Sequence, residues 1–188
     1  MAEEIDACAV AHGHGSEAAT LPSSAVSSGP VSPAERQLVA VFASPVSGYL
    51  LRYAADAGYR TLLVEPDGSR ADGAKMAGFT VAGEMPEDLD GADVVVTDHH
   101  RDELGVLLRD ALAAKARWIG IIGKPGIVGP HVAALESLGV APGEIARVHR
   151  PIGLNIGSRT PPEIAVSTLA GLIADRNSRP GGFAFAVA

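Results

Sequence analysis

Short apolar runs alternate with helical stretches from residue 37 to residue 177, and this alternation restricts the fold more than any other feature of the chain. The runs are too apolar for strands with a solvated face. Alternating β and α elements are typical of βαβ units, which build a parallel sheet with right-handed crossovers. We therefore predict an α/β fold: a doubly wound, mostly parallel, Rossmann-like sheet with helices on both faces. The predicted strands are 37–43, 60–65, 79–82, 92–97 and 117–122, and the predicted helices are 46–57, 71–76, 101–116, 129–138 and 164–177.

Residues 1–36 differ in composition from the rest of the chain. They are rich in Ala, Ser, Gly, His and Pro, lack apolar periodicity, and carry five acidic residues against one basic residue. We predict a flexible tail over 1–36, one domain over 37–182 and a short tail over 183–188. His12 and His14 in the first tail have no carboxylate or further cysteine beside them to complete a metal site, so no metal ligand is predicted.

Composition and charge exclude several classes of function. Of the 188 residues, 47% are hydrophobic but only 4% aromatic, which disfavours an aromatic-rich β-sandwich. The formal net charge of −7 argues against nucleic acid or an anionic membrane as a bulk partner. No apolar run approaches the roughly 20 residues of a membrane span, and the N-terminus lacks the features of a secretory signal. Cys8 is the single cysteine and can form no internal disulfide, so we expect a cytoplasmic protein.

The loops at the carboxyl ends of the predicted strands are the places to look for a site, because doubly wound sheets bind ligands there. The first of these loops contains Ser44, Ser47 and Gly48 but only the last glycine of a dinucleotide-binding pattern, and Pro45 removes one amide donor. Two interpretations stay open for Ser44 and Pro45: an anion-binding loop, or an ordinary N-cap with proline at the first helical position.

Glu65 ends the second predicted strand, at the position of the acid that binds a ribose in dinucleotide-binding folds. A carboxylate before a Pro-Asp-Gly turn is also ordinary surface chemistry, so both interpretations stay open.

Asp98, His99 and His100 follow the fourth predicted strand. Adjacent histidines in an extended segment point apart, which favours proton transfer or hydrogen bonding by one of them over a shared metal. The alternative is a helix N-cap with exposed histidines.

Two further segments carry candidate ligand-binding residues. Gly123 and Lys124 follow the fifth predicted strand; the surrounding sequence is not a P-loop, but the lysine can hold a phosphate as a point charge. Gly153, Asn155 and Gly157 lie in a later stretch, where paired glycines indicate a backbone held close to another group. Part of that stretch has a structural explanation, since Thr160 and Glu163 have the spacing of a capping box.

Several strings in the second half of the chain resemble the XdhC/CoxI family, whose members are accessory proteins of xanthine and carbon monoxide dehydrogenases. The resemblance covers the Rossmann-type C-terminal domain of that family, roughly residues 37–179. It implies a non-catalytic accessory or chaperone protein that binds molybdenum cofactor (molybdopterin) and helps to sulfurate it or deliver it to an apo-dehydrogenase. The strings are Arg117-Trp118-Ile119-Gly120-Ile121-Ile122-Gly123, Glu144-Ile145-Ala146-Arg147-Val148-His149, Pro151-Ile152-Gly153-Leu154, Ile156-Gly157 and Thr160-Pro161-Pro162-Glu163-Ile164-Ala165-Val166-Ser167.

The chain also departs from the pattern of that family. Its first loop, residues 43–48, replaces a glycine-rich loop; Arg150 stands where relatives often have cysteine, and Asn155 where they usually have aspartate. The smaller N-terminal domain of the family is not supplied by residues 1–36. A sulfur relay through a pocket cysteine is therefore not expected.

From residues and resemblance together we predict a cofactor-binding site without catalytic or metal-ligating residues. The phosphate of the pterin would be held by amides of the first loop and by Lys124, with Arg150 or Arg159 assisting, while Glu65 and Asn155 hydrogen-bond a pterin or ribose edge. The alternatives are an NAD(P)-binding oxidoreductase and a ligand-free docking subunit. The expected partner is an apo molybdenum hydroxylase or a cofactor-sulfurating enzyme, and a homodimer is also compatible with the fold. The predicted cofactor-binding residues are Ser44, Ser47, Gly48, Glu65, Asp98, His99, Gly123, Lys124, Arg150, Gly153, Asn155 and Gly157.

Overall fold

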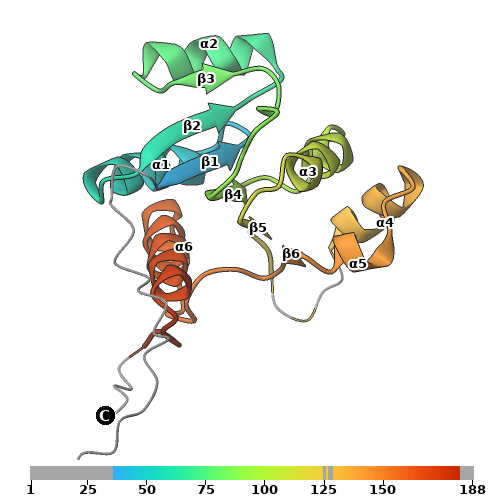
Figure 1. The fold of residues 1–188 in the computed structure, drawn as a ribbon. Helices are drawn as coiled ribbons and strands as arrows, with labels where there is room; N and C mark the ends of the chain where they lie inside the picture. The colour runs from blue at the N-terminus through green and yellow to red at the C-terminus, as the bar shows by residue number, and fades with distance from the viewer. Residues whose placement is uncertain (1–35, 125, 127–128, 183–188) are drawn as a thin grey trace, which may run out of the picture. The chain divides into compact units, whose positions relative to one another are not determined.

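The computed structural model describes residues 36–124, 126 and 129–182, which build one six-stranded sheet with helices packed against it (Figure 1). The predicted tails lie outside the described residues, except for Arg36. The strands are β1 (Gln37–Val41), β2 (Arg60–Val64), β3 (Val81–Ala82), β4 (Ala92–Val96), β5 (Trp118–Ile121) and β6 (Val148–His149). The helices are α1 (Pro45–Asp56), α2 (Gly68–Met76), α3 (Leu104–Ala113), α4 (Pro130–Ser137), α5 (Pro142–Ile145) and α6 (Pro161–Arg176).

The strand order is β3-β2-β1-β4-β5-β6, and every neighbouring pair is parallel. The chain builds the sheet outward from β1 in one direction and then from β4 in the other. This confirms the predicted doubly wound α/β fold. The order reverses between β1 and β4, whose last residues Val41 and Val96 are paired, and the crevice at such a reversal is where doubly wound sheets bind ligands.

The two faces of the sheet bury different residues because successive side chains of a strand point to opposite sides. On β1, Leu38 and Ala40 join a core with α1 and α6, whereas Val39 and Val41 join a core with α3 and α4. All five residues of β4 are buried, as expected of a central strand covered on both faces. Between residues 36 and 182, no helix has both the length and the apolar character that crossing a bilayer would require.

Seven of the ten predicted elements are shorter in the structure, and for two of them the local reason is clear. The first strand ends at Val41, not at residue 43, because Phe42 turns the chain with a positive φ of 71°. Helix α3 begins at Leu104, not at residue 101. The Leu104 amide donates to the Arg101 carbonyl at 3.1 Å, so residues 101–103 form a turn before the first helical residue.

Two short elements were not predicted at all. Helix α5 has four residues, and β6 has two, of which Val148 is buried and His149 exposed. Neither is long enough to show a periodicity in the sequence. Strand β6 pairs with β5 through Gly120 and His149. As a result, Arg150 lies at the carboxyl end of β6. The segment 150–157, which contains Gly153 and Gly157, then lies beside the loops that follow β4 and β5.

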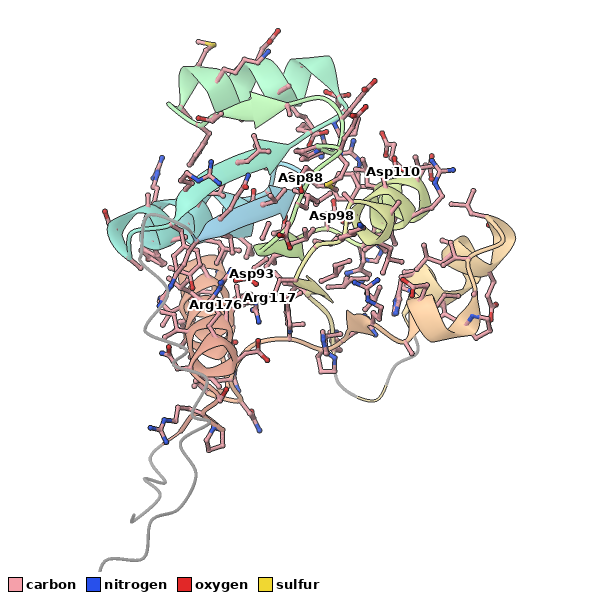
Figure 2. The ribbon with its side chains drawn as sticks, viewed as in Figure 1. Asp88, Asp93, Asp98, Asp110, Arg117 and Arg176 are labelled. Carbon is pink, nitrogen blue, oxygen red and sulfur yellow. The ribbon has the colours of Figure 1, made fainter. Side chains whose placement is uncertain are left out.

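A buried ion cluster at the amino-terminal ends of the strands fixes α6 against β4. Asp93 is fully buried and accepts 2.7 Å hydrogen bonds from Nε of Arg117 and from Nε of Arg176, the last residue of α6 (Figure 2). Arg176 also donates to the carbonyl of Gly91. Because the carboxyl-terminal end of α6 is held at the amino-terminal ends of the strands, the helix begins near their carboxyl ends, where the loop before it contributes to a cavity.

Candidate functional site: a cationic cavity at the carboxyl edge of the sheet

A cavity of about 820 Å³ lies where the loops after β4, β5 and β6 meet the start of α6. We call it the cationic cavity. It brings together seven of the twelve predicted site residues, although these come from three separate stretches of sequence. The seven are His99, Gly123, Lys124, Arg150, Gly153, Asn155 and Gly157, and the other lining residues are His100, Ile122, Pro151, Ile152, Leu154, Ile156, Ser158, Ile164 and Ser167.

The charge of this cavity opposes that of the protein as a whole. Lys124 and Arg150 line it together with two histidines, and no aspartate or glutamate is among its lining residues, all of which belong to the described part of the chain. The chain as a whole has a net charge of −7. The apolar part of the lining consists largely of isoleucine and leucine side chains. A cavity of this kind suits a ligand with an anionic end and a flat, less polar body.

Arg150 is positioned by the glycines of neighbouring segments. A Cβ atom at Gly123 would overlap the guanidinium group of Arg150, and one at Gly129 would overlap its Cδ. The side chain therefore lies directly against the loop that carries Lys124. Arg150 also lines an adjoining cavity of about 530 Å³, which His99 and His100 share. Gly123, one of the predicted cofactor-binding residues, thus leaves space for the side chain of Arg150.

His99 faces both of these cavities as a neutral imidazole at neutral pH. Partial burial lowers its pKa from 6.5, and the charges of His100 and Arg150 lower it further; Asp98 and a hydrogen bond to the Ile122 backbone oppose the shift. The rings of His99 and His100 lie with centroids 4.1 Å apart, so the expectation that these side chains point apart is wrong. The reason is that residues 98–100 are not extended: the His100 amide donates to the Asp98 carboxylate at 3.0 Å and closes a turn. A neutral histidine keeps one nitrogen able to accept a hydrogen bond, so His99 adds an acceptor to a wall that is otherwise rich in donors.

The backbone of residues 153–157 passes close to α6 at Gly153. Gly153 has a φ of 91°, and a Cβ there would overlap the Ser167 hydroxyl on α6. Gly157 has a φ of 69° with open space around it, so it serves a turn. Asn155 lies between them, exposed at the cavity wall. The helix start that follows agrees with prediction: the Glu163 carboxylate accepts hydrogen bonds from the amides of Arg159 and Thr160, and Arg159 itself is not among the residues that line the cavity.

Ser44, Ser47 and Gly48 lie away from the cationic cavity. They line a smaller cavity of about 330 Å³ beside α1 and α2, and the two cavities share no lining residue. The N-cap interpretation of this loop is confirmed: Ser44 Oγ accepts from the Ser47 amide at 3.1 Å, and Ser47 Oγ accepts from the Ser44 amide at 2.8 Å. The Gly48 amide donates to the Ser44 carbonyl. An anion would have to open this cap to reach those amides.

Glu65 is also engaged by the chain itself. Its carboxylate is fully buried and accepts from the Ala43 amide at 2.7 Å and from the Asp67 amide at 2.9 Å. Arg101 donates to both carboxylate oxygens. These contacts hold the loop after β1 to the loops after β2 and β4. Asp98, the remaining predicted residue, makes the turn to His100 and does not line the cationic cavity.

Sequence reasoning missed several residues of the site. Ser158 and Ser167 line the cationic cavity, and both lie in or beside the strings that carried the family resemblance. His131 on α4 is buried beside Arg150, and its Nδ1 has no hydrogen-bond partner among the described residues. No sequence signal marks a lone histidine in a helix. The described ranges contain no group of three or more His, Cys, Asp or Glu side chains placed to hold a metal ion.

Comparisons with known proteins agree with this architecture. The family model described as the XdhC Rossmann domain matches residues 38–172. The uncharacterized protein YqeB of Escherichia coli (strain K12) is 36% identical over 89 residues, which are 47% of this chain and 16% of YqeB. A crystal structure described as a xanthine dehydrogenase from Bacillus halodurans superimposes with a TM-score of 0.59 at 22% identity, over 76% of this chain and 45% of that one. The chain therefore spans less than half the length of either protein, and the structural likeness shows the shared fold.

Proposed function

The chain belongs to the XdhC family through its Rossmann domain, and on that premise we propose that it binds the molybdenum cofactor as an accessory factor of a xanthine dehydrogenase-type molybdenum hydroxylase. The acceptor is an apo-hydroxylase of the xanthine or carbon monoxide dehydrogenase type, or the enzyme that sulfurates its cofactor. The protein acts as a carrier or chaperone in the cytoplasm, and its own residues hold the cofactor without transforming it.

The observation that supports this proposal is the composition of the cationic cavity. Its volume of about 820 Å³ lies within the usual range of cofactor sites, roughly 300–1,000 Å³. Lys124 and Arg150 supply the cations that a terminal phosphate requires, and arginine can bind such a group through two parallel hydrogen bonds. The apolar wall beside Ile152 and Ile156 suits the flat face of a pterin. The donor set and the walls thus fit a phosphorylated pterin.

Each polar residue of the cavity has a definable task in this account. Lys124 and Arg150 hold the phosphate, Asn155 and Ser158 hydrogen-bond the edge of the pterin, and neutral His99 accepts a hydrogen bond from one of its N–H groups. The isoleucine wall excludes water from the pterin face. When bound, the cofactor supplies the redox-active molybdenum that the acceptor enzyme uses.

Two observations disfavour the alternative of an NAD(P)-dependent oxidoreductase. The amides of Ser44 and Ser47, which would face a pyrophosphate, already bond to serine hydroxyls. Glu65, which would bind the ribose, already accepts bonds from the backbone and from Arg101. A dinucleotide would have to displace both sets of contacts, whereas the cationic cavity is open.

An anaerobic thermal-unfolding titration tests the proposal. The protein is titrated in parallel with molybdenum cofactor, NAD⁺ and NADP⁺. At a hundredfold excess over Kd, a bound ligand raises stability by about 2.7 kcal/mol, which corresponds to roughly 5–10 °C for a chain of this size. We expect that shift with the molybdenum cofactor alone. A shift with a nicotinamide nucleotide instead, or no shift with any of the three, contradicts the proposal, and the second result favours a ligand-free docking subunit.

A further inference from the structure

A second large depression lies on the other side of α3 from α4. It has a volume of about 900 Å³ and is bordered by the segment between β3 and β4 on one side and by α3 on the other (Figure 1). We call it the acidic groove. Five acidic residues line it, namely Glu84, Glu87, Asp102, Glu103 and Asp110. No lysine or arginine is among its lining residues, all of which the structure describes.

The floor of the groove is an uncovered stripe of α3. Val106, Asp110 and Ala113 follow one another at the i, i+4 and i+7 spacing of one helix face, and all three line the groove. The Val106 side chain is 41% exposed. Elsewhere on α3, Gly105 packs closely against Ala134 of α4. The uncovered stripe extends over eight residues, from Val106 to Ala113, a rise of roughly 10 Å that matches about two turns of a partner helix.

The acidic side chains of the groove are only partly neutralised. Arg109 pairs with Asp110 at 2.8 Å, and Arg101 pairs with Glu103 at 3.2 Å. In the part of the chain that the structure describes, Glu84, Glu87 and Asp102 take part in no ion pair. Three acidic groups beside apolar lining residues such as Met85, Pro86 and Val106 attract a segment that combines basic and apolar side chains.

We propose that the acidic groove docks a basic amphipathic helix of a partner protein, with its apolar side chains against Val106 and its lysines or arginines against Glu84, Glu87 and Asp102. Charge argues against this chain's own N-terminal residues as the occupant, because residues 1–36 carry five acidic residues and one basic residue. The proposal goes beyond cofactor binding and does not depend on what fills the cationic cavity.

The groove also has a useful position relative to the cationic cavity. Asp102 lines both the groove and the adjoining cavity that contains Arg150, His99 and His100. The Arg101–Glu103 ion pair lies at the boundary between them. A helix docked in the groove therefore places its parent protein next to the adjoining cavity, which shares His99, His100 and Arg150 with the cationic cavity.

Peptide binding to the full chain tests this proposal. The probe is a synthetic amphipathic peptide of about 18 residues, long enough to form helix, with leucines on one face and lysines on the flanks. A second peptide has glutamate in place of every lysine. We expect the lysine peptide to bind in a fluorescence anisotropy titration at about 50 mM salt, and to bind more weakly at high salt. The glutamate peptide should not bind.

Charge-reversal variants locate the binding surface. Glu84→Lys combined with Glu87→Lys should weaken binding of the lysine peptide at least about tenfold. The control, Asp56→Lys combined with Glu136→Lys, makes the same change in net charge at exposed residues outside the groove and should keep most of the affinity. Amide shifts in NMR spectra should concentrate on residues 83–87 and on α3.

Three outcomes would overturn the proposal: no binding of the lysine peptide, equal losses in the groove variant and the control, or amide shifts centred elsewhere. These outcomes are separable from failure of the proposed cofactor binding. The peptide is measured without cofactor, and the groove variant should still give the thermal shift with molybdenum cofactor.

Discussion

The guanidinium group of Arg150 occupies the space that a side chain at position 123 would need. Gly123 follows β5 and Arg150 follows β6, so this close approach joins two loops at the carboxyl edge of the sheet and fixes a cation beside Lys124. Two residues that the sequence indicates for separate reasons are thus parts of one arrangement. Cofactor affinity should depend on both.

Replacing Gly123 with alanine should lower cofactor affinity about tenfold, because the new Cβ displaces Arg150 and one charge-assisted contact is lost. The clash is with the end of a flexible side chain, so the unfolding midpoint should change by no more than about 2–4 °C. Isothermal titration and thermal unfolding measure the two effects. Gly143→Ala is the control, since a Cβ there meets nothing within 4 Å. Equal affinities of Gly123→Ala and the wild type would show that the placement of Arg150 is irrelevant to binding.

Removal of the buried carboxylate at position 93 should destabilise the fold without affecting the site. Asp93→Asn leaves the guanidinium group of Arg176 without its counter-charge, while Arg117 keeps only its pair with the more exposed Asp175. Breaking a buried pair in this way costs about 3–5 kcal/mol. Urea unfolding measures this change. Asp72→Asn removes the exposed partner of Lys75 and should leave the midpoint nearly unchanged. A small effect of Asp93→Asn would mean that the cluster does not anchor α6.

The cap of α1 should contribute to stability and not to cofactor binding. Ser47 is buried, and its hydroxyl both accepts from the Ser44 amide and donates to the Ser44 carbonyl. Ser47→Ala should therefore cost about 1 kcal/mol of unfolding free energy. Its affinity for molybdenum cofactor should equal that of the wild type, because this loop lies outside the cationic cavity. A large loss of cofactor affinity in Ser47→Ala would indicate that the loop 43–48 binds the phosphate.

Stability should fall as the pH drops below neutrality, partly through His131. Burial lowers the pKa of this histidine from 6.5, and the charge of Arg150 lowers it further. The unfolded chain therefore takes up a proton first, so the stabilisation is complete above about pH 6.5 and is lost as the pH falls through the lower folded-state pKa. His99 contributes with the same sign.

Thermal unfolding at pH 7.5 and pH 5.5 measures this dependence. The difference between the two midpoints should be smaller for His131→Gln than for the wild type. Ser137→Ala, which changes an exposed residue without an ionisable side chain, should keep the wild-type difference. If His131→Gln responds to pH as the wild type does, His131 is not the titrating group.

Much of this fold can be predicted from the sequence because long helices and strands have recognisable residue patterns. Strand β4 is a run of valines that is buried throughout, and α1 and α6 carry proline starts and capping residues that mark their first turns. By contrast, β6 exists only because Val148 and His149 pair with β5, and two residues have no period of their own. Tertiary pairing, not local preference, defines such an edge strand.

The sequence marks several lining residues of the cationic cavity as candidates but does not reveal that they lie together. Lys124 and Arg150 stand out as cations near predicted strand ends or family strings, yet only the pairing of β6 brings them to one cavity. Ser44 and Glu65 were also predicted to contact a ligand, but their side chains bond to the chain itself. A polar side chain in a sequence does not reveal whether its partner is a ligand or the backbone.

The most direct test of the account is the affinity for molybdenum cofactor of the Lys124→Ala, Arg150→Ala double variant. Trp118 is the single tryptophan of the chain, and it packs over Gly120 together with Ile152, a residue of the cavity wall. The fluorescence of Trp118, measured under anaerobic conditions, can therefore follow binding. The control is Lys75→Ala with Arg179→Ala, which removes the same charge elsewhere on the surface. We expect the affinity to be at least about a hundredfold weaker in the double variant and unchanged in the control. Wild-type affinity in the double variant would contradict this expectation.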